Sequence, residues 1–342
     1  TLPESVERLP RIGARAALAR GRATDGTRSG TFEDVLTMTP ADIRDGLPAD
    51  LAERVLTWDS GDPVPERSAE VTLWVPPYTS TAADLALMAR LPGLQSVQAL
   101  TAGVDAHLPH LPEGVTLCNA AGVHDASTAE LAVGLALASL RHLDEFARAM
   151  PAGRWAYDRH ESLADKRVLI VGFGAIGQAI ARRLEGFECE VTAVARTARA
   201  VGAITVHPVP ELPSLLPTVD VVILIVPLTE ATRGLVDAAF LGRMRDGALL
   251  VNMSRGPIVA TDALGAECAS GRLRAALDVT DPEPLPAEHP LWRTPGVLIS
   301  PHVGGNTSAF LPRARRLVAD QIRRRDAGEP LANVVVPGAP LR

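Results

Sequence analysis

The sequence is short of several residue types, and each shortage excludes a class of protein. Only three of its 342 residues are cysteines (Cys118, Cys189 and Cys268), and their spacing forms no C-x-x-C motif for a metal or a redox pair. We therefore expect reduced thiols that fill core space in a cytoplasmic protein. The eight histidines show no H-x-x-x-H spacing either, so no metal site is predicted.

Charge and hydropathy exclude two further classes. A net charge of −6 gives no reason to expect a nucleic-acid partner. The longest run of small apolar residues, 131–140, is about half as long as a helix that spans a bilayer. The first ten residues contain Glu4, Glu7 and Arg8 instead of the apolar segment of a secretion signal. We expect a protein that is neither secreted nor bound to a membrane.

A glycine-rich turn is the clearest positive signal. The apolar run 168–171 leads into Gly-Phe-Gly-Ala-Ile-Gly, and apolar residues then recur with helical spacing. Gly172 permits the turn, Gly174 lets the backbone approach a pyrophosphate, and Gly177 lets helix and strand pack closely. The free N–H groups of the helix start, which includes Ala175 and Ile176, would face the phosphates. The pattern predicts a bound dinucleotide, with a ligand-free glycine turn as the alternative.

Strands and helices alternate along most of the chain. Residues 1–45 lack apolar periodicity and are interpreted as an extension outside the main core, in which 11–20 could form a short helix. A helix is predicted at 127–141, with Ser127 as its cap and Glu130 three residues later. After the glycine turn, apolar strands indicate a doubly wound parallel sheet. These strands are expected at 191–195, 219–226, 248–252, 275–279 and 297–300.

Five further segments carry recognisable patterns besides the glycine turn. They are 101–105 (TAGVD), 127–131 (STAEL), 252–256 (NMSRG), 278–284 (DVTDPEP) and 301–305 (PHVGG). In this order, the six segments resemble the D-isomer-specific 2-hydroxyacid dehydrogenase family, in its glyoxylate/hydroxypyruvate reductase and phosphoglycerate dehydrogenase-like branch.

The resemblance implies a fold and an assembly. The fold is α/β, with two Rossmann-like or flavodoxin-like domains and a doubly wound parallel sheet in the cofactor domain. Residues 46–120 plus 306–342 would form the substrate domain, and residues 121–305 the NAD(P)-binding Rossmann domain. A homodimer that pairs through the cofactor domain, near 131–140, is also expected.

The resemblance further implies hydride transfer between NAD(P)H and a small 2-keto acid or D-2-hydroxy acid. Arg255 would hold the carboxylate and polarise the carbonyl, since its planar charged fork suits both. His302 would donate the proton in reduction and accept it in oxidation, a role that suits imidazole near neutral pH. Glu283, if adjacent, would stabilise the imidazolium.

Binding residues follow from the same resemblance. The backbone N–H groups of Ala102 and Gly103 would hold the substrate carboxylate. Asp278 would contact the nicotinamide, and the loop at 76–79 would shape the pocket wall. The residues expected to line the adenosine and nicotinamide ribose are Pro227, Met253 and Ser254.

The end of the strand expected at 191–195, the first after the turn, favours NADP(H) over NAD(H). The family's ribose-binding acid should stand eighteen residues after Gly177, and this position is Ala195. Arg196, Thr197 and Arg199 follow, and they offer positive charge and a hydroxyl to a 2′-phosphate. NAD stays open, because arginines are common throughout this chain.

Two other functions remain as alternatives. A non-catalytic dinucleotide-sensing scaffold of the same fold would bind cofactor without turnover. A formate or phosphite dehydrogenase would use the same fold on another substrate. An intact catalytic trio favours the 2-hydroxyacid enzyme.

Overall fold

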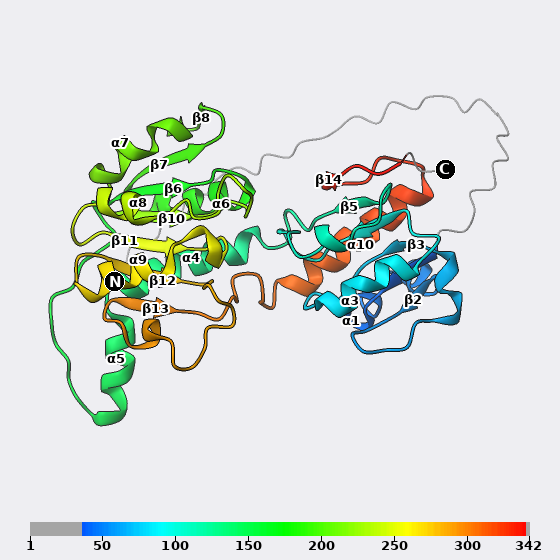
Figure 1. Ribbon diagram of the computed structural model, residues 1–342, viewed down its shortest axis with the longest axis horizontal. Coiled ribbons are helices and arrows are strands. Elements are labelled where there is room, and N and C mark those ends of the chain that lie inside the picture. The colour runs from blue at the N-terminus through cyan, green and yellow to red at the C-terminus, as the bar shows by residue number, and fades with distance from the viewer. Residues whose placement is uncertain (1–35, 340–342) are drawn as a thin grey trace, which may run out of the picture. The chain divides into compact units, whose positions relative to one another are not determined.

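The computed structural model describes residues 36–339, and every structural statement below concerns this range. Most of the predicted extension lies outside it, as does the short helix expected at 11–20. The described residues form two β-sheets, each flanked by helices (Figure 1).

The first sheet has six strands in the order β14-β5-β4-β3-β1-β2. Their bounds are β1 Leu36–Thr39, β2 Val55–Thr57, β3 Val71–Trp74, β4 Ser96–Gln98, β5 Thr116–Cys118 and β14 Val334–Val336. All are parallel except β14, which pairs antiparallel with β5. The five parallel strands have a flavodoxin-like order, in which ligands bind beyond the carboxyl ends of the strands.

Strand β1 corrects the predicted end of the N-terminal extension. Leu36–Thr39 lies between β2 and β3, and all four of its residues are buried. The prediction placed residues 36–45 outside the core because LTMT alternates polar and apolar residues and forms no apolar run. In the sheet both faces of this strand are covered, so its threonines are buried as well.

Helices cover both faces of the first sheet. On one face pack α1 (Ala41–Arg44), α2 (Ala49–Ala52) and α10 (Phe310–Asp326), in a core that includes Ile43, Val75 and Val318. On the other face α3 (Ala82–Leu85) packs with Trp74 and Met88. Arg325, in the last turn of α10, is buried and donates hydrogen bonds to the Thr72 carbonyl and the Gln95 side chain.

The second sheet has eight strands in the order β13-β12-β11-β10-β6-β7-β9-β8. Their bounds are β6 Arg167–Val171, β7 Glu190–Ala195, β8 Arg199–Val201, β9 Ile204–Pro208, β10 Val221–Leu224, β11 Leu249–Asn252, β12 Arg274–Leu277 and β13 Val297–Ile299. All but β8 run parallel. The order reverses at β6, between β7 and β10, which is the switch point where such sheets bind ligands. The predicted doubly wound sheet is confirmed.

Helices also cover both faces of the second sheet. Helices α4 (Asp125–Leu140) and α6 (Ala175–Leu184) share one core. The other face carries α7 (Leu212–Leu215), α8 (Ala238–Arg243) and α9 (Thr261–Ala269). The predicted cap of α4 is wrong: the helix begins two residues before Ser127, whose hydroxyl donates to the His124 carbonyl.

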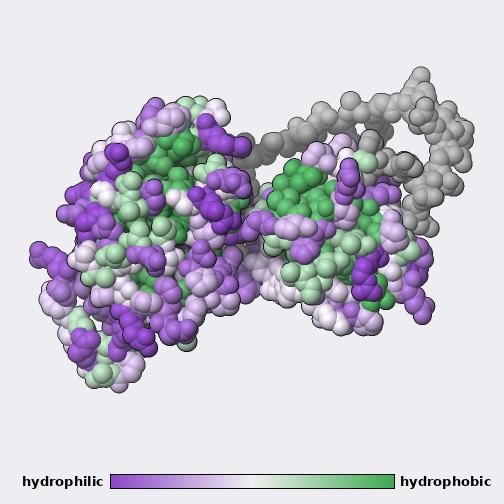
Figure 2. Space-filling model, viewed as in Figure 1, coloured by the Kyte–Doolittle hydropathy of each residue, from purple (hydrophilic) through white to green (hydrophobic). Residues whose placement is uncertain are grey.

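The surface, the length of the helices and the burial of the cysteines can also be compared with the sequence predictions. In Figure 2 hydrophobic residues, in green, are visible over β14, where Val334 and Val335 are each 44% exposed. No helix in residues 36–339 is both long enough and apolar enough to cross a membrane. Cys118 and Cys268 are buried as predicted, whereas Cys189 is only half-buried. Burial raises the pKa of the Cys118 thiol to about 11 and that of the Cys268 thiol to about 12.

Candidate active site

The glycine turn follows β6 at the switch point of the second sheet. Gly172 has a φ of +103°, and a Cβ there would lie 2.2 Å from the carbonyl oxygen of Ile225. A Cβ on Gly177 would lie 2.3 Å from the Gly172 carbonyl oxygen, so this glycine lets α6 pack on the turn. Gly174 has open space where its Cβ would stand. Gly174 is also the exposed glycine of the three, so a ligand can approach its backbone.

The start of α6 fits an anionic group. Gly174 precedes the helix and has no side chain that could cap it. Within residues 36–339 the N–H groups of Ala175, Ile176 and Gly177 donate no hydrogen bond. Free N–H groups at the positive end of a helix dipole bind phosphates. These residues therefore fit the pyrophosphate of a dinucleotide.

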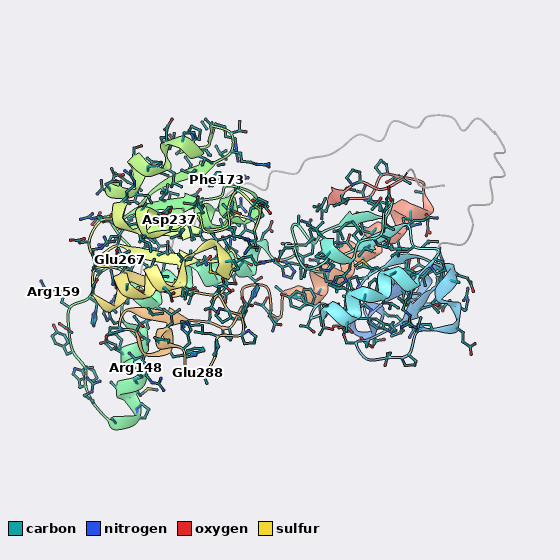
Figure 3. The ribbon with its side chains drawn as sticks, in the orientation of Figure 1. Arg148, Arg159, Phe173, Asp237, Glu267 and Glu288 are labelled. Atoms are coloured by element: carbon teal, nitrogen blue, oxygen red, sulfur yellow. The ribbon has the colours of Figure 1, made fainter. Side chains whose placement is uncertain are left out.

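Positive charge lies beside this turn. Strand β7 ends at the half-buried Ala195, and Arg196 and Thr197 are exposed. Arg199 turns back, and its Nη2 donates to the Phe173 carbonyl oxygen at 2.7 Å. Its guanidinium carbon lies 5.9 Å from the centre of the Phe173 ring, which Figure 3 labels. Arg199 is thus tied to the glycine turn, while Arg196 projects without an ion pair among the described residues.

The loops after β10 and β11 are joined by Ser254. Its Oγ accepts a hydrogen bond of 2.9 Å from the Val226 N–H, and its own N–H donates to the Asn252 side chain. Pro227 is exposed next to Val226, and the buried Met253 packs beside Gly304. The Ser254 hydroxyl therefore fixes the loops after β10 and β11 to each other, on one side of the switch point.

Asp278 holds the loop that carries His302. Its buried carboxylate accepts hydrogen bonds from the Ser300 hydroxyl at 2.7 Å and from the N–H groups of Val303 and Gly304, each at 2.9 Å. Three donors satisfy this carboxylate, so the contacts give Asp278 a positioning role. Its predicted contact with the nicotinamide stays a prediction.

His302 and Glu283 form a hydrogen-bonded pair. His302 Nδ1 lies 2.5 Å from Glu283 Oε1, and His302 Nε2 has no partner within residues 36–339. Burial alone would raise the pKa of Glu283, but the hydrogen bond and charge of His302, with Arg255, lower it overall. His302 also has a φ of +53°, an uncommon value for a non-glycine residue. Such backbone outliers cluster at functional sites.

Arg255 reaches from the loop after β11 to the loop after β4. Its Nη1 donates to the Ser254 carbonyl oxygen at 2.9 Å, and its Nη2 lies 3.2 Å from Asp105 Oδ1. A Cβ on Gly103 would lie 1.9 Å from Arg255 Nη2, so the guanidinium covers this glycine. Arg255 therefore joins the two loops in which the sequence predicts substrate contacts.

The loop after β4 offers free backbone donors. The Thr101 hydroxyl donates to the Gly103 carbonyl oxygen at 2.7 Å, and the Asn119 side chain donates to the Ala102 carbonyl oxygen at 2.8 Å. The N–H groups of Ala102 and Gly103 donate no hydrogen bond in the described part of the chain. Free backbone donors beside an arginine suit a carboxylate.

Comparisons with known proteins identify the family of this chain. Residues 133–304 match the family described as D-isomer specific 2-hydroxyacid dehydrogenase, NAD binding domain. The human glyoxylate reductase/hydroxypyruvate reductase is 33% identical over 318 residues, which cover 85% of this chain and 94% of that protein. The chain belongs to the D-isomer-specific 2-hydroxyacid dehydrogenase family. A glyoxylate/hydroxypyruvate reductase of Arabidopsis thaliana is 34% identical over 75% of this chain and 83% of its own length.

Solved structures of this family share the fold. A D-isomer-specific 2-hydroxyacid dehydrogenase from Xanthobacter autotrophicus, in complex with NADPH and MES, has a TM-score of 0.77 at 32% identity, over 89% of this chain and 98% of that one. An NADPH-dependent glyoxylate/hydroxypyruvate reductase from Sinorhizobium meliloti, in complex with NADP and malonate, has a TM-score of 0.76 at 26% identity, over 90% and 99%. The predicted family and fold class are confirmed, and the chain is an NAD(P)-dependent oxidoreductase.

Some contacts of the dehydrogenase site carry no signal in the sequence. Asp105 pairs with Arg255, and His124 contacts both the loop after β4 and the loop of His302. Tyr78 lies in the loop at 76–79 that is expected to shape the pocket wall, but no pattern singles it out. No group of three or more His, Cys, Asp or Glu side chains in residues 36–339 could hold a metal ion.

Proposed function

We propose that this dehydrogenase reduces a small 2-keto acid of the glyoxylate and hydroxypyruvate class to the D-2-hydroxy acid, with NADPH as its preferred reductant. The observation that carries the proposal is that adjacent loops bring together an arginine, free backbone N–H groups and a histidine–glutamate pair. Arg255 covers Gly103, free N–H groups stand beside it, and His302 is bonded to Glu283. Together these groups match what ketone reduction next to a carboxylate requires.

Each side chain has a role in the proposed reaction. Arg255 and the N–H groups of Ala102 and Gly103 bind the carboxylate, and Arg255 polarises the ketone oxygen. His302 donates the Nε2 proton to that oxygen as it becomes a hydroxyl, and takes it back in oxidation. Glu283 stabilises the imidazolium through Nδ1. Bound reduced nicotinamide supplies the hydride.

The cofactor would lie along the switch point of the second sheet. Its pyrophosphate would meet the N–H groups at the start of α6, and Asp278 would lie near the nicotinamide. A 2′-phosphate would lie near the end of β7. The residues proposed to surround that phosphate are Arg196, Thr197 and Arg199, and those proposed along the ribose are Pro227, Met253 and Ser254.

A panel of 2-keto acids tests the proposal. Purified protein with NADPH should consume the reduced cofactor with glyoxylate or hydroxypyruvate, and the product should have the D configuration. Dinucleotide binding without turnover across the panel would favour the sensing scaffold. Reduction of NADP⁺ by formate or phosphite alone would favour the formate or phosphite dehydrogenase.

We further propose a homodimer formed through the cofactor domain, residues 121–305. Helix α5 (Leu143–Ala149) and the loop after it, which we call the apolar arm, expose large apolar side chains. These are Leu143, Phe146, Met150, Trp155 and Tyr157. Exposed apolar patches mark partner surfaces, and closed two-fold dimers are the commonest oligomers.

The remaining expectations are proposals as well. We place the protein in the cytoplasm on the basis of its unpaired thiols, and propose no nucleic-acid partner on the basis of its net charge. The substrate domain is proposed as 46–120 plus 306–342, now extended to include β1 and α1.

A further inference from the structure

Both ring nitrogens of His124 face backbone carbonyl oxygens beside the active site. Nε2 lies 2.7 Å from the Leu100 oxygen, and Nδ1 lies 3.3 Å from the Gly305 oxygen. The residue is only 4% exposed. Leu100 directly precedes the loop that offers the free N–H groups, and Gly305 lies three residues after His302. His124 therefore lies where the two loops of the site meet.

A neutral His124 ring can donate to only one of these two carbonyl oxygens. A neutral imidazole has one N–H and one lone pair, and a carbonyl oxygen can only accept. The shorter contact assigns the proton to Nε2, which donates to Leu100. The lone pair of Nδ1 then faces another acceptor, Gly305, and no described residue donates to it. A buried acceptor in this position is unfavourable until a donor reaches it.

Tyr78 brings a hydroxyl to the same place. A Cβ on Gly305 would lie 2.7 Å from His124 Nδ1 and also 2.7 Å from the Tyr78 hydroxyl oxygen. The two polar atoms therefore lie close together on the side of Gly305 where a side chain would not fit. Tyr78 makes no side-chain hydrogen bond within residues 36–339. Burial and the charge of Asp278 outweigh Arg255 and raise the pKa of Tyr78, so its hydroxyl keeps its proton as a donor.

Aromatic packing fixes the two rings. The Phe310 ring centre lies 4.4 Å from that of Tyr78 and 5.4 Å from that of His124. The carbonyl oxygen of His124 accepts hydrogen bonds from the Ser127 hydroxyl and the Thr128 N–H at the start of α4. A donor and an acceptor held in this way are preorganised for a ligand group.

We propose that Tyr78 and His124 form a hydroxyl-binding pair that selects 2-keto acids with a hydroxyl group on carbon 3. That hydroxyl donates to His124 Nδ1 and accepts from the Tyr78 hydroxyl. Glyoxylate has no carbon 3, and pyruvate has a methyl group there, so neither completes the pair. Hydroxypyruvate does. The inference rests on the proposed function, because it assumes that a 2-keto acid lies against Arg255 and His302.

The test compares kcat/KM for hydroxypyruvate, pyruvate and glyoxylate with NADPH. In Tyr78→Phe the ring packing stays and only the donor is lost. The preference for hydroxypyruvate over pyruvate should fall about tenfold, the effect of one hydrogen bond. Tyr157→Phe removes the chain's other tyrosine hydroxyl, which is on an exposed residue of the apolar arm, and should leave all three values unchanged.

A second variant, His124→Phe, tests the same pair in case Tyr78→Phe does not fold. His124→Phe keeps an aromatic ring and removes Nδ1, so the same preference should fall in the same direction. Thermal melting and NADPH binding establish that each variant is folded. An unchanged preference, or an equal loss for all three acids, would overturn the hydroxyl-binding pair alone. A wild-type protein that reduces glyoxylate and pyruvate but not hydroxypyruvate would do the same. Absence of turnover with every 2-keto acid would overturn the proposed function and this inference together.

Discussion

His302 and Glu283 lie nineteen residues apart in the sequence, and the structure brings His302 Nδ1 to 2.5 Å from Glu283 Oε1. Glu283 comes from the loop after β12, and His302 from the loop after β13. Asp278 accepts hydrogen bonds from the backbone of the second loop. The backbone around His302 is therefore held by Asp278, and its ring is oriented separately by Glu283. The result is an imidazole with one nitrogen held and the other free, the arrangement of a positioned general acid.

Removal of this imidazole should abolish most of the proton transfer. We expect His302→Ala to lower kcat for reduction roughly 10²–10⁴-fold, the range for loss of one positioned acid–base group. NADPH binding should persist, because the glycine turn at 172–177 is separate from His302. His110→Ala, which removes a histidine from the first sheet region, serves as the control. A His302→Ala enzyme with near wild-type kcat would refute the assignment.

Protonation of the Glu283 carboxylate in acid should remove the stability that its pairing with His302 contributes. The pKa of Glu283 is lowered in the folded protein, so its carboxylate stabilises the fold above its unfolded pKa. That contribution is lost as the pH falls through the lower folded value. We therefore expect Glu283→Gln to reduce stability slightly near pH 7, with the difference from wild type shrinking once the pH falls below the unfolded pKa and vanishing below the lowered folded pKa. Urea unfolding across this range measures it, and a difference that grows in acid would contradict the pairing.

The sequence predicts those elements whose own residues form an apolar run or another local pattern. Strand β10 is an apolar run of four residues, which indicates a buried strand. The three spaced glycines of the turn likewise indicate its backbone conformation. Strand β1 has no such run, and its burial results from β2 and β3 on either side. Arg325 looks like one of three helix-end arginines, yet Thr72 and Gln95 accept hydrogen bonds from it inside the protein.

The same distinction applies to the site. Arg255, Glu283 and His302 lie in loops with recognisable patterns, so resemblance identifies them. The contact of Arg255 with Asp105 spans 150 residues, and that of His124 with Gly305 spans 181. No local pattern encodes pairings over such separations. That both ring nitrogens of His124 face carbonyl oxygens becomes apparent only in the structure, where Leu100 and Gly305 lie next to the ring.

The apolar arm predicts a stable dimer. Trp155 is 91% exposed and Tyr157 90%, and both should be covered by a second copy of the chain. Light scattering at micromolar protein should give twice the chain mass of 36.1 kDa. Trp155→Asp should shift the population toward monomer, whereas Trp292→Asp, at another exposed tryptophan, should not. A wild-type monomer would contradict the dimer, and a Trp155→Asp dimer would exclude the arm.

Cofactor preference should follow from the residues at the end of β7. An NAD enzyme of this fold usually places an acid where Ala195 stands, to bind the ribose 2′-hydroxyl and repel a 2′-phosphate. Ala195 removes that repulsion, and the exposed Arg196 adds a charge with no ion-pair partner in residues 36–339. One charge-assisted hydrogen bond is worth about 1.5–3 kcal/mol. Wild type should therefore prefer NADPH by roughly one to two orders of magnitude in kcat/KM.

The double variant Ala195→Asp/Arg196→Ser should reverse this preference. It restores the acid and removes the free arginine, but leaves Arg199, whose hydrogen bond to the Phe173 carbonyl supports the glycine turn. NADH should then be used better than NADPH with the same 2-keto acid. Arg90→Ser removes an exposed arginine from the first sheet region and should leave the ratio unchanged. If wild type prefers NADH, or if the double variant keeps the wild-type ratio, the residues after β7 do not bind a 2′-phosphate.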